Sequence, residues 1–219
     1  MTSTSTEPGE GAIRFRYRLD PPHAADTLDA DRFERLGAWR NILQQLHLLG
    51  RDAHRYDGYA YGNMSTRDLQ TPARFYVTAS QTSGAPRLDP QDIVRVDTWN
   101  AERFEVTAAG ALPPSSESIT HGIVYAADPT IAWIMHVHAP AIWRAAARLQ
   151  LPHTAADVGY GSPQMARAVA ALARQYAARP LVFVTLGHED GVFACGATAE
   201  DTGAALVRTL AAALVGAPQ

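Results

Sequence analysis

Two histidines stand two positions apart inside the apolar run IMHVHAP, residues 134–140. Alternate residues of a strand share one face, so His136 and His138 are expected on the same side, roughly 7 Å apart at Cα. Neutral imidazole is a common ligand of zinc and similar divalent metals, and two such rings can converge on one ion. The alternative is a pair hydrogen-bonded at a strand end, because burying imidazole without a polar partner is costly. The pair alone does not decide between these interpretations.

A third histidine, His188, stands in TLGHEDGVFACG, between two expected strands. Taken alone, a histidine in such a turn is more often an ordinary surface residue, although loops also carry functional groups on a rigid scaffold. A catalytic zinc site typically has three protein ligands and one open position. The three residues His136, His138 and His188 would complete such a set if the loop histidine reached the strand pair.

The segment PPSSESITH, residues 113–121, offers a carboxylate beside two hydroxyls. Ser115 and Ser116 can cap a helix, and the exposed N–H groups there would form an anion-binding cup. Glu117 is a candidate acid/base, although the helix dipole also favours a carboxylate in a first turn. His121 is expected on the same helical face, where it could orient Glu117 or approach the metal. The alternative is a capped surface helix.

Two further loops combine glycine with hydroxyl groups, which suits close backbone approach to a phosphate or carboxylate. The first, YGNMSTR, offers Gly62, Asn63, Ser65 and Arg67. The second, TASQTSG, offers Thr78, Ser80, Thr82, Ser83 and Gly84. Each is weak evidence alone, since most such stretches are simply turns.

The elements that would position these residues follow from hydrophobic periodicity and turn signals. The pattern predicts an edge strand over Ile13–Leu19 and an amphipathic helix over Asp31–Leu49 that stops at Gly50. Further strands are expected at Phe75–Thr78, Ile93–Val96, Ile131–His138, Leu181–Leu186 and Gly191–Cys195. Helices are expected at Ser116–Ala126, Pro140–Leu149, Pro163–Ala178 and Ala199–Val215, the last two capped by Ser162 and Thr198.

Length and composition argue against a nucleic-acid-binding protein and against a membrane-spanning one. The 219 residues suit one domain over 13–219 after a flexible tail at 1–12, with no stretch able to cross a bilayer. The net charge of −3 gives no basic footprint for nucleic acid. The lone Cys195 fits a reducing compartment, and with no signal peptide the cytoplasm is expected. We expect Cys195 to pack as a small hydrophobe, and no role for His23, His47, His54 and His153.

Read in order, the motifs GNMS, TASQTSG, PSSE, HVH and GHEDG resemble those of the class II aldolase/adducin family, from about Asp31 to Val215. The resemblance implies a three-layer α/β/α fold with a mainly antiparallel central sheet. It also implies a homotetramer with sites at subunit interfaces. In that family the equivalents of His136, His138 and His188 hold zinc or a similar divalent ion, and Glu117 is the acid/base. The substrate's phosphate or equivalent anion would lie against Gly62, Asn63, Ser83, Gly84, Ser115 and Ser116.

The function that this resemblance implies is a metal-dependent lyase acting on a small hydroxy-carbonyl compound, for example a sugar phosphate. Aldol cleavage through an enediolate is the default reaction, while decarboxylation, dehydration and epimerisation would use the same site. The nearest candidate for the tyrosine that protonates the leaving aldehyde is Tyr160. The alternative from another class is a non-catalytic interaction domain like the adducin head. We favour the enzyme, because a ligand set assembled beside an acid/base is typical of an active site.

Overall fold

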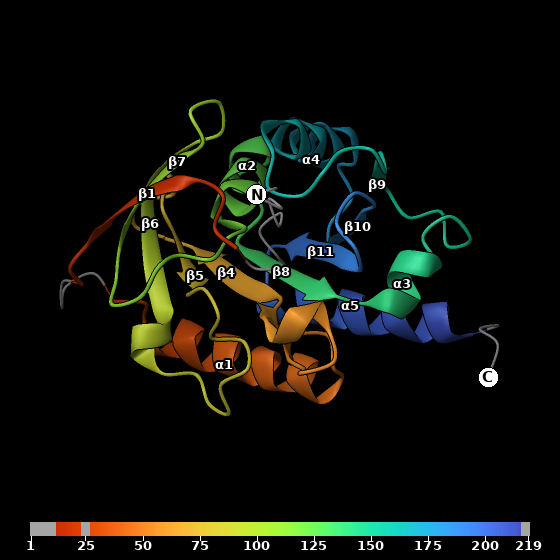
Figure 1. Cartoon of the computed structure of the whole chain (residues 1–219), viewed down its shortest axis with the longest axis horizontal. Coiled ribbons are helices and arrows are strands. Elements are labelled where there is room, and N and C mark those ends of the chain that lie inside the picture. The colour runs from red at the N-terminus through yellow and green to blue at the C-terminus, as the bar shows by residue number, and fades with distance from the viewer. Residues whose placement is uncertain (1–11, 23–26, 216–219) are drawn as a thin grey trace, which may run out of the picture.

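A mainly antiparallel sheet runs through the computed structural model, which describes residues 12–22 and 27–215 (Figure 1). Its strands are β1 (Arg16–Asp20), β4 (Asn63–Arg67), β5 (Phe75–Thr78), β6 (Ile93–Asn100), β7 (Glu105–Ala109), β8 (Trp133–His138), β9 (His153–Thr154), β10 (Leu181–Thr185) and β11 (Gly191–Gly196). Within the described residues they lie in the order β1-β7-β6-β5-β4-β8-β11-β10-β9. The two outermost pairs are parallel and the pairs between them are antiparallel.

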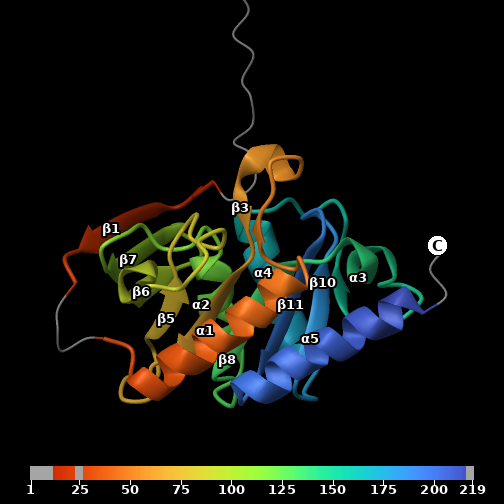
Figure 2. The ribbon, with the colours of Figure 1, turned by 90° about the horizontal axis from the view of Figure 1, so that it is seen from below.

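Helices cover both faces of this sheet. They are α1 (Ala30–Gln45), α2 (Ser118–Ala127), α3 (Pro140–Arg144), α4 (Pro163–Gln175) and α5 (Ala199–Leu214). One apolar core contains residues of α2 and α4, and the other contains residues of α1, α3 and α5. Figures 1 and 2 show α2 and α4 on one side of the sheet and α1 and α5 on the other. The expected three-layer fold is therefore confirmed.

The central strand β8 shows the alternation that the sequence predicts. It is paired on both sides, with β4 and with β11, and all six of its residues are buried. Trp133, Met135 and Val137 pack into the core with α1 and α5, whereas Ile134 packs into the core with α2 and α4. Because side chains alternate along a strand, His136 and His138 share the face of Ile134.

The first helix ends earlier than its periodicity predicts. α1 stops at Gln45 rather than at Leu49, and His47, with φ of 55°, turns the chain in the left-handed region. Gly50 does not stop the helix but begins β2 (Gly50–Arg51), which pairs with β3 (Ala60–Tyr61). Between these strands lies a short 3-10 helix, η2 (Tyr56–Gly58), which projects from the body of the molecule in Figure 2. A second one, η3 (Pro90–Asp92), precedes β6.

Other boundaries also differ from expectation. Two helices expected to end at Leu149 and Ala178 end at Arg144 and Gln175, although the predicted caps at Ser162 and Thr198 are both formed. β1 lies at a sheet edge as expected, while β7 has no counterpart in the prediction and β4 replaces a predicted loop. The tail expected over 1–12, His23 and the end of the chain lie almost entirely outside the described residues. Among the helices that are described, none is both long and apolar enough to span a membrane.

Candidate metal and anion site

Three histidines from two segments meet at the end of β8. His136 and His138 come from the strand itself, and His188 comes from the turn between β10 and β11. The pairing of β11 with β8 sets Gly191 opposite His138, which brings this turn to the strand end. One ring nitrogen of each histidine lies within 4.8 Å of those of the other two, and all three side chains are buried. The predicted convergence of the loop histidine on the strand pair is therefore confirmed.

The donor set fits a divalent metal. The ring of His136 donates from Nδ1 to the carbonyl oxygen of Val192 at 3.2 Å, which leaves Nε2 as the nitrogen with a lone pair. Such a bond sets the ring's tautomer and orientation in the way that metal-binding histidines require. His188 is held by a turn in which its N–H donates to Thr185 and its carbonyl accepts from Gly191, both at 3.0 Å. Three neutral imidazoles grouped in this way are a typical zinc-binding set.

Each imidazole of this cluster packs against an aromatic ring from elsewhere in the chain. The centroid separations are 4.2 Å for His136 and Phe193, 4.6 Å for His138 and Tyr56, and 4.3 Å for His188 and Tyr160. Bulky rings at these distances leave the imidazoles little room to rotate and exclude water from their sides. The cluster is therefore rigid and largely dry on the protein side.

Glu117 lies beside the cluster, immediately before α2. Its side chain is buried, and its Oε1 is 3.5 Å from Nδ1 of His188. The backbone N–H of Glu117 donates to Oγ of Ser115 at 3.3 Å, and the hydroxyl of Ser118 donates to the Ser115 carbonyl at 2.6 Å. These bonds form a turn that presents the carboxylate. A carboxylate so close to the histidines can exchange a proton with a molecule bound at them.

The expected capping of α2 by serine is wrong. The helix begins at Ser118 rather than at Ser116, Glu117 occupies the capping position, and no side chain accepts a cap hydrogen bond there. Ser115 instead stabilises the turn before the helix. The first N–H groups of α2 are consequently not taken up by a side-chain cap.

A small cavity adjoins the histidines and contains most of the predicted anion-binding residues. Its lining includes Gly62, Asn63, Ser83, Ser115 and Ser116, together with Ala60, Ala79, Ser80, Gln81, Glu117 and His136. We call this cavity the anion cup. It adjoins the histidine cluster because His136 belongs to both, and because Glu117 of its lining lies 3.5 Å from His188. Gly84 is not part of this lining.

Two glycines near the cup have steric reasons to lack a side chain. A Cβ on Gly62, which has φ of 75°, would lie 2.6 Å from Cβ of Leu49 and 3.0 Å from the carbonyl oxygen of His136. A Cβ on Gly84 would lie 2.6 Å from Cβ of Arg51. Gly62 thus allows the start of β4 to approach β8, while Gly84 allows the loop to pack against β2.

The polar groups of the cup are held by different partners. The hydroxyl of Ser83 donates to the Gly62 carbonyl. Within the described part of the chain, the buried Oδ1 of Asn63 has no hydrogen-bond partner. An unsatisfied buried amide is unusual in a native protein, and a bound ligand is one group that satisfies it.

The loop that carries Ser83 is anchored by α1, a contact that sequence reasoning did not find. The buried guanidinium of Arg40 donates to the carbonyls of Thr82 (3.0 Å), Ser83 (3.1 Å) and Ala85 (2.6 Å). Gln44, one turn later, donates to the same two carbonyls of Ser83 and Ala85. The sequence does contain one signal for this contact. Arg40 stands four residues after Leu36 and three before Leu43, a spacing that puts it on the buried face of the helix.

Some residues predicted near the ligand lie elsewhere. Ser65 is in the core, where its Oγ is 2.6 Å from Nδ1 of His121 and 2.7 Å from the hydroxyl of Tyr125. Arg67 donates to carbonyls, among them that of Ile131 at 2.7 Å. The interpretation of these two residues as anion ligands is wrong, because neither lines the anion cup and their polar groups bond to partners in the core. The ring of His121 bonds to Ser65, and burial lowers its pKa to about 3.

Tyr160 and Cys195 complete the predicted residues. The hydroxyl of Tyr160 donates to the carbonyl of Ala12 at 3.3 Å while its ring covers His188, so this hydroxyl has a backbone acceptor. Cys195 packs in the core as expected, where burial raises the pKa of its thiol to about 12. His47, His54 and His153 are exposed.

Known proteins match both this sequence and this fold. The family model for the class II aldolase and adducin N-terminal domain matches residues 44–214. The methylthioribulose-1-phosphate dehydratase of Leptospira biflexa is 34% identical over 77 residues, which span 35% of this chain and 35% of that curated relative.

Two solved structures illustrate the likeness of fold. The fuculose-1-phosphate aldolase of Thermus thermophilus superposes with a TM-score of 0.62 at 20% identity, covering 85% of this chain and 93% of the other. A sugar-phosphate aldolase from Thermotoga maritima superposes with a TM-score of 0.64 at 13% identity, covering 84% and 93%. With the order of motifs, the histidine cluster and a family match over most of its length, the chain belongs to the class II aldolase and adducin family.

Proposed function

We propose that the protein is a divalent-metal-dependent lyase that breaks or forms a carbon–carbon bond beside a carbonyl group, through an enediolate. Its substrate is a small hydroxy-carbonyl compound that carries a phosphate or an equivalent anion. The observation that supports this best is the placement of Glu117 at 3.5 Å from His188, between the histidine cluster and the anion cup. A metal site, an acid/base and an anion site thus adjoin one another.

In this proposal His136, His138 and His188 hold the metal, and zinc is the ion that three imidazoles suit best. A divalent ion bound there would stabilise negative charge that develops on the carbonyl and hydroxyl oxygens of the substrate. The aromatic neighbours of the three rings keep them in place and keep bulk water away, which strengthens electrostatic interactions inside the site.

Glu117 moves the proton. In the cleavage direction its carboxylate removes the proton of the hydroxyl group that becomes the aldehyde. The electron pair of the breaking carbon–carbon bond then passes to the carbonyl fragment, and the protonated Glu117 can return its proton to that fragment. The position of Glu117 suits this task, because a general acid or base must lie within reach of the group whose proton it moves, and its carboxylate is buried beside the histidines.

The anion cup holds the far end of the substrate. Gly62, Asn63, Ser83, Ser115 and Ser116 offer amide and hydroxyl groups close to the start of α2, where backbone N–H groups favour negative charge. We keep Gly84 in the proposal only as the residue that lets the loop pack against β2.

Dehydration is the second candidate reaction. The match to a methylthioribulose-1-phosphate dehydratase favours it, although that match covers about a third of either chain. Dehydration would also begin with proton removal by Glu117 and would expel a hydroxyl group instead of a carbon fragment. Decarboxylation and epimerisation would use the same residues, so a panel of substrates has to separate these reactions.

The assembly and the location belong to the same proposal. We infer a homotetramer with sites at its subunit interfaces and a cytoplasmic protein, in keeping with family resemblance and the single buried thiol of Cys195. Light scattering of the purified protein tests the assembly, and a dimer or a monomer would contradict it.

Metal analysis combined with turnover tests the proposed function. The wild type should purify with one equivalent of a divalent ion and turn over at least one phosphorylated hydroxy-carbonyl compound. His136→Ala should lose both properties, and Glu117→Gln should keep the ion while its kcat falls about 10²–10⁴-fold. His153→Ala, which changes an exposed histidine, is the matched control. A wild type without stoichiometric metal, indifferent to His136→Ala, would instead indicate an interaction domain like the adducin head.

A further inference from the structure

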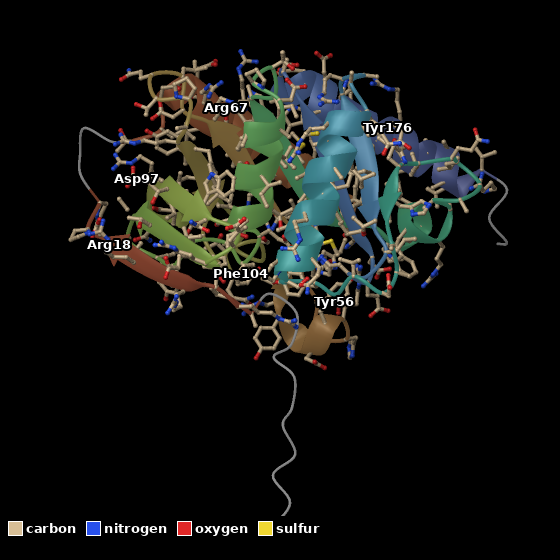
Figure 3. All side chains as sticks on the ribbon, turned by 90° about the horizontal axis from the view of Figure 1, so that it is seen from above. Arg18, Tyr56, Arg67, Asp97, Phe104 and Tyr176 are labelled. Carbon is tan, nitrogen blue, oxygen red and sulfur yellow. The ribbon has the colours of Figure 1, made fainter. Side chains whose placement is uncertain are left out.

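We propose that Tyr56 is a positioning residue for the metal site, acting on two of its three histidines at once. Its ring supports His138, and its hydroxyl holds the turn that carries His188. This inference rests on the proposed metal site and extends it to a segment, Arg55–Gly58, that lies far from either histidine in the sequence. Figure 3 labels Tyr56 on this segment, which projects from one end of the molecule.

The hydroxyl of Tyr56 takes part in a chain of polar contacts. It donates to Oδ2 of Asp190 at 2.7 Å, and it accepts from Nη2 of Arg55 at 2.7 Å. The same Nη2 lies 4.0 Å from the Asp190 carboxylate, so the buried negative charge has a cation near it. A hydrogen bond to a carboxylate is stronger than one between neutral groups. Tyr56 and Asp190 are therefore firmly linked.

Asp190 connects this chain to both histidine segments. It stands two residues after His188, in the turn between β10 and β11. Its carbonyl accepts a hydrogen bond at 2.8 Å from the N–H of Ala139, the residue that follows His138. The side chain of Asp190 thus links Tyr56 to the point where the two histidine segments are themselves joined.

The ring of Tyr56 acts on His138 directly. The two rings meet edge to face, with centroids 4.6 Å apart and planes at 70°. The ring centroid of Tyr61 lies 5.0 Å from that of Tyr56 and 5.7 Å from that of His138, so two tyrosine rings border the imidazole of His138. The guanidinium of Arg55 lies over both tyrosine rings, at 4.9 Å and 4.7 Å from their centroids. His138 therefore has a fixed orientation before any ion binds.

The backbone supports this interpretation. Tyr56, Asp57 and Asp190 have φ values of 51°, 54° and 61°, in the left-handed region that residues other than glycine seldom adopt. Such conformations persist where surrounding contacts hold them, and they gather at ligand sites. Both residues of the Tyr56–Asp190 hydrogen bond thus have a backbone conformation that surrounding contacts must stabilise. We infer that the bond keeps His138 and His188 at the separation that metal binding needs.

Metal titration of the purified protein tests this inference. Tyr56→Phe removes only the hydroxyl, and we expect Zn²⁺ affinity, measured against a chromophoric chelator, to fall about 10–100-fold, as when outer partners of metal ligands are removed. The absorption spectrum of the Co²⁺-loaded protein should change as well, because its bands report ligand geometry. Tyr59→Phe is the matched control, since Tyr59 is an exposed tyrosine three residues away. It should leave both properties unchanged.

Asp190→Asn provides a second route, because it keeps the shape of the side chain and removes its charge. We expect it to weaken Zn²⁺ binding, because it replaces the charge-assisted hydrogen bond from Tyr56 with a weaker neutral one. The loss of affinity in the double variant should be much smaller than the product of the two single losses, since both changes act on the same hydrogen bond. Wild-type affinity in Tyr56→Phe, or in Asp190→Asn should Tyr56→Phe fail to fold, would overturn the inference. A wild type that binds no Zn²⁺ or Co²⁺ would overturn the proposed metal site itself.

Discussion

His121 shows how burial of a single side chain ties stability to pH. Burial lowers the pKa of this histidine from 6.5 to about 3, so it is neutral in the folded protein at ordinary pH. The unfolded chain takes up a proton on this residue below about pH 6.5, whereas the folded chain does so only near pH 3. This difference favours the unfolded state as the pH falls through that window.

We therefore expect the free energy of unfolding to fall by about 1.4 kcal/mol per pH unit below 6.5 through this residue alone. Urea unfolding at pH 7.5 and 5.5, in the wild type and in His121→Asn, measures the effect. All other ionisable groups are common to the two proteins, so their contributions cancel in the comparison. An equal loss of stability in the two proteins would contradict this account of His121.

Arg40 is the second residue whose burial has a consequence. Its guanidinium supplies donors to three carbonyls of the loop that carries Ser83. Arg40→Met should lower the free energy of unfolding by about 2–4 kcal/mol, because buried carbonyls lose a charged donor. It should also raise KM for the anionic substrate more than it lowers kcat, because the loop belongs to the anion cup.

Urea unfolding and steady-state kinetics measure both effects, with Arg103→Met as the control at an exposed arginine. Unchanged stability in Arg40→Met would show that the loop does not depend on α1. A fall in kcat at constant KM would place Arg40 in the chemistry rather than in the support of the cup.

At the scale of elements, strands with apolar alternation could be predicted and strands built from polar residues could not. The sequence predicts β8 because the strand lies in a short, mostly apolar run, Ile131–His138, and both of its faces are buried. The polar residues Asn63, Ser65 and Arg67 predict an anion-binding loop, yet they belong to β4, and all five residues of this strand are buried. Their partners, such as His121 and Ile131, are more than fifty positions away. Local pattern carries no information about such distant partners.

Helix ends were missed for a related reason. The apolar periodicity that predicted α1 runs on through Leu46 and Leu49, but His47 turns the chain and Leu49 packs from outside the helix. Periodicity reports which residues are buried and not which element buries them. The same limit explains the helix expected to run to Leu149, where α3 ends at Arg144 and turns follow.

The approach of β4 to β8 depends on glycine, which gives a prediction for these elements. Gly62 and Gly58 share φ of 75°, but a Cβ on Gly62 would meet Leu49 and His136, whereas one on Gly58 would meet nothing within 4 Å. Gly58→Ala should therefore cost about 1 kcal/mol from backbone strain alone. Gly62→Ala should cost about 3 kcal/mol or more, because strand displacement is added to the strain.

Urea unfolding of the two variants compares these costs, and Zn²⁺ titration shows whether the displacement reaches His136. Gly62→Ala should weaken metal binding more than Gly58→Ala, because only the methyl group on Gly62 would meet the carbonyl oxygen of His136. Equal stability of the two variants would mean that the chain relaxes around the added methyl group and that the contact does not matter.

For the whole molecule, the order of motifs was enough to predict the fold and the candidate ligands. It did not contain the pairing of β11 with β8, which brings His188 to the strand pair. Nor did it contain the Arg55–Gly58 segment, whose Tyr56 lacks any motif around it. Residues whose type suits a ligand, such as metal-binding histidines, can be found in a sequence. Residues that support them from a distant segment can be found only in the folded structure.

Metal removal should change the stability of the whole molecule. An ion that binds only the folded state stabilises it by RT ln(1 + [L]/Kd), about 4 kcal/mol at a thousandfold excess over Kd. We expect a chelator to lower the Tm of the wild type by several degrees and to leave the Tm of His136→Ala unchanged. Calorimetry with and without chelator measures this. A wild-type Tm that stays the same when the chelator is added would argue against a bound metal.

The anion cup is assembled from both sides of the sheet. Its Ser83 loop is tied to α1 beneath the strands, and its serine turn leads into α2 above them. The separation between Ser83 and Glu117 across the cup is consequently set by the layers of the fold and not by any one flexible side chain. A longer or shorter molecule held between these two residues would require one helical layer to move relative to the sheet.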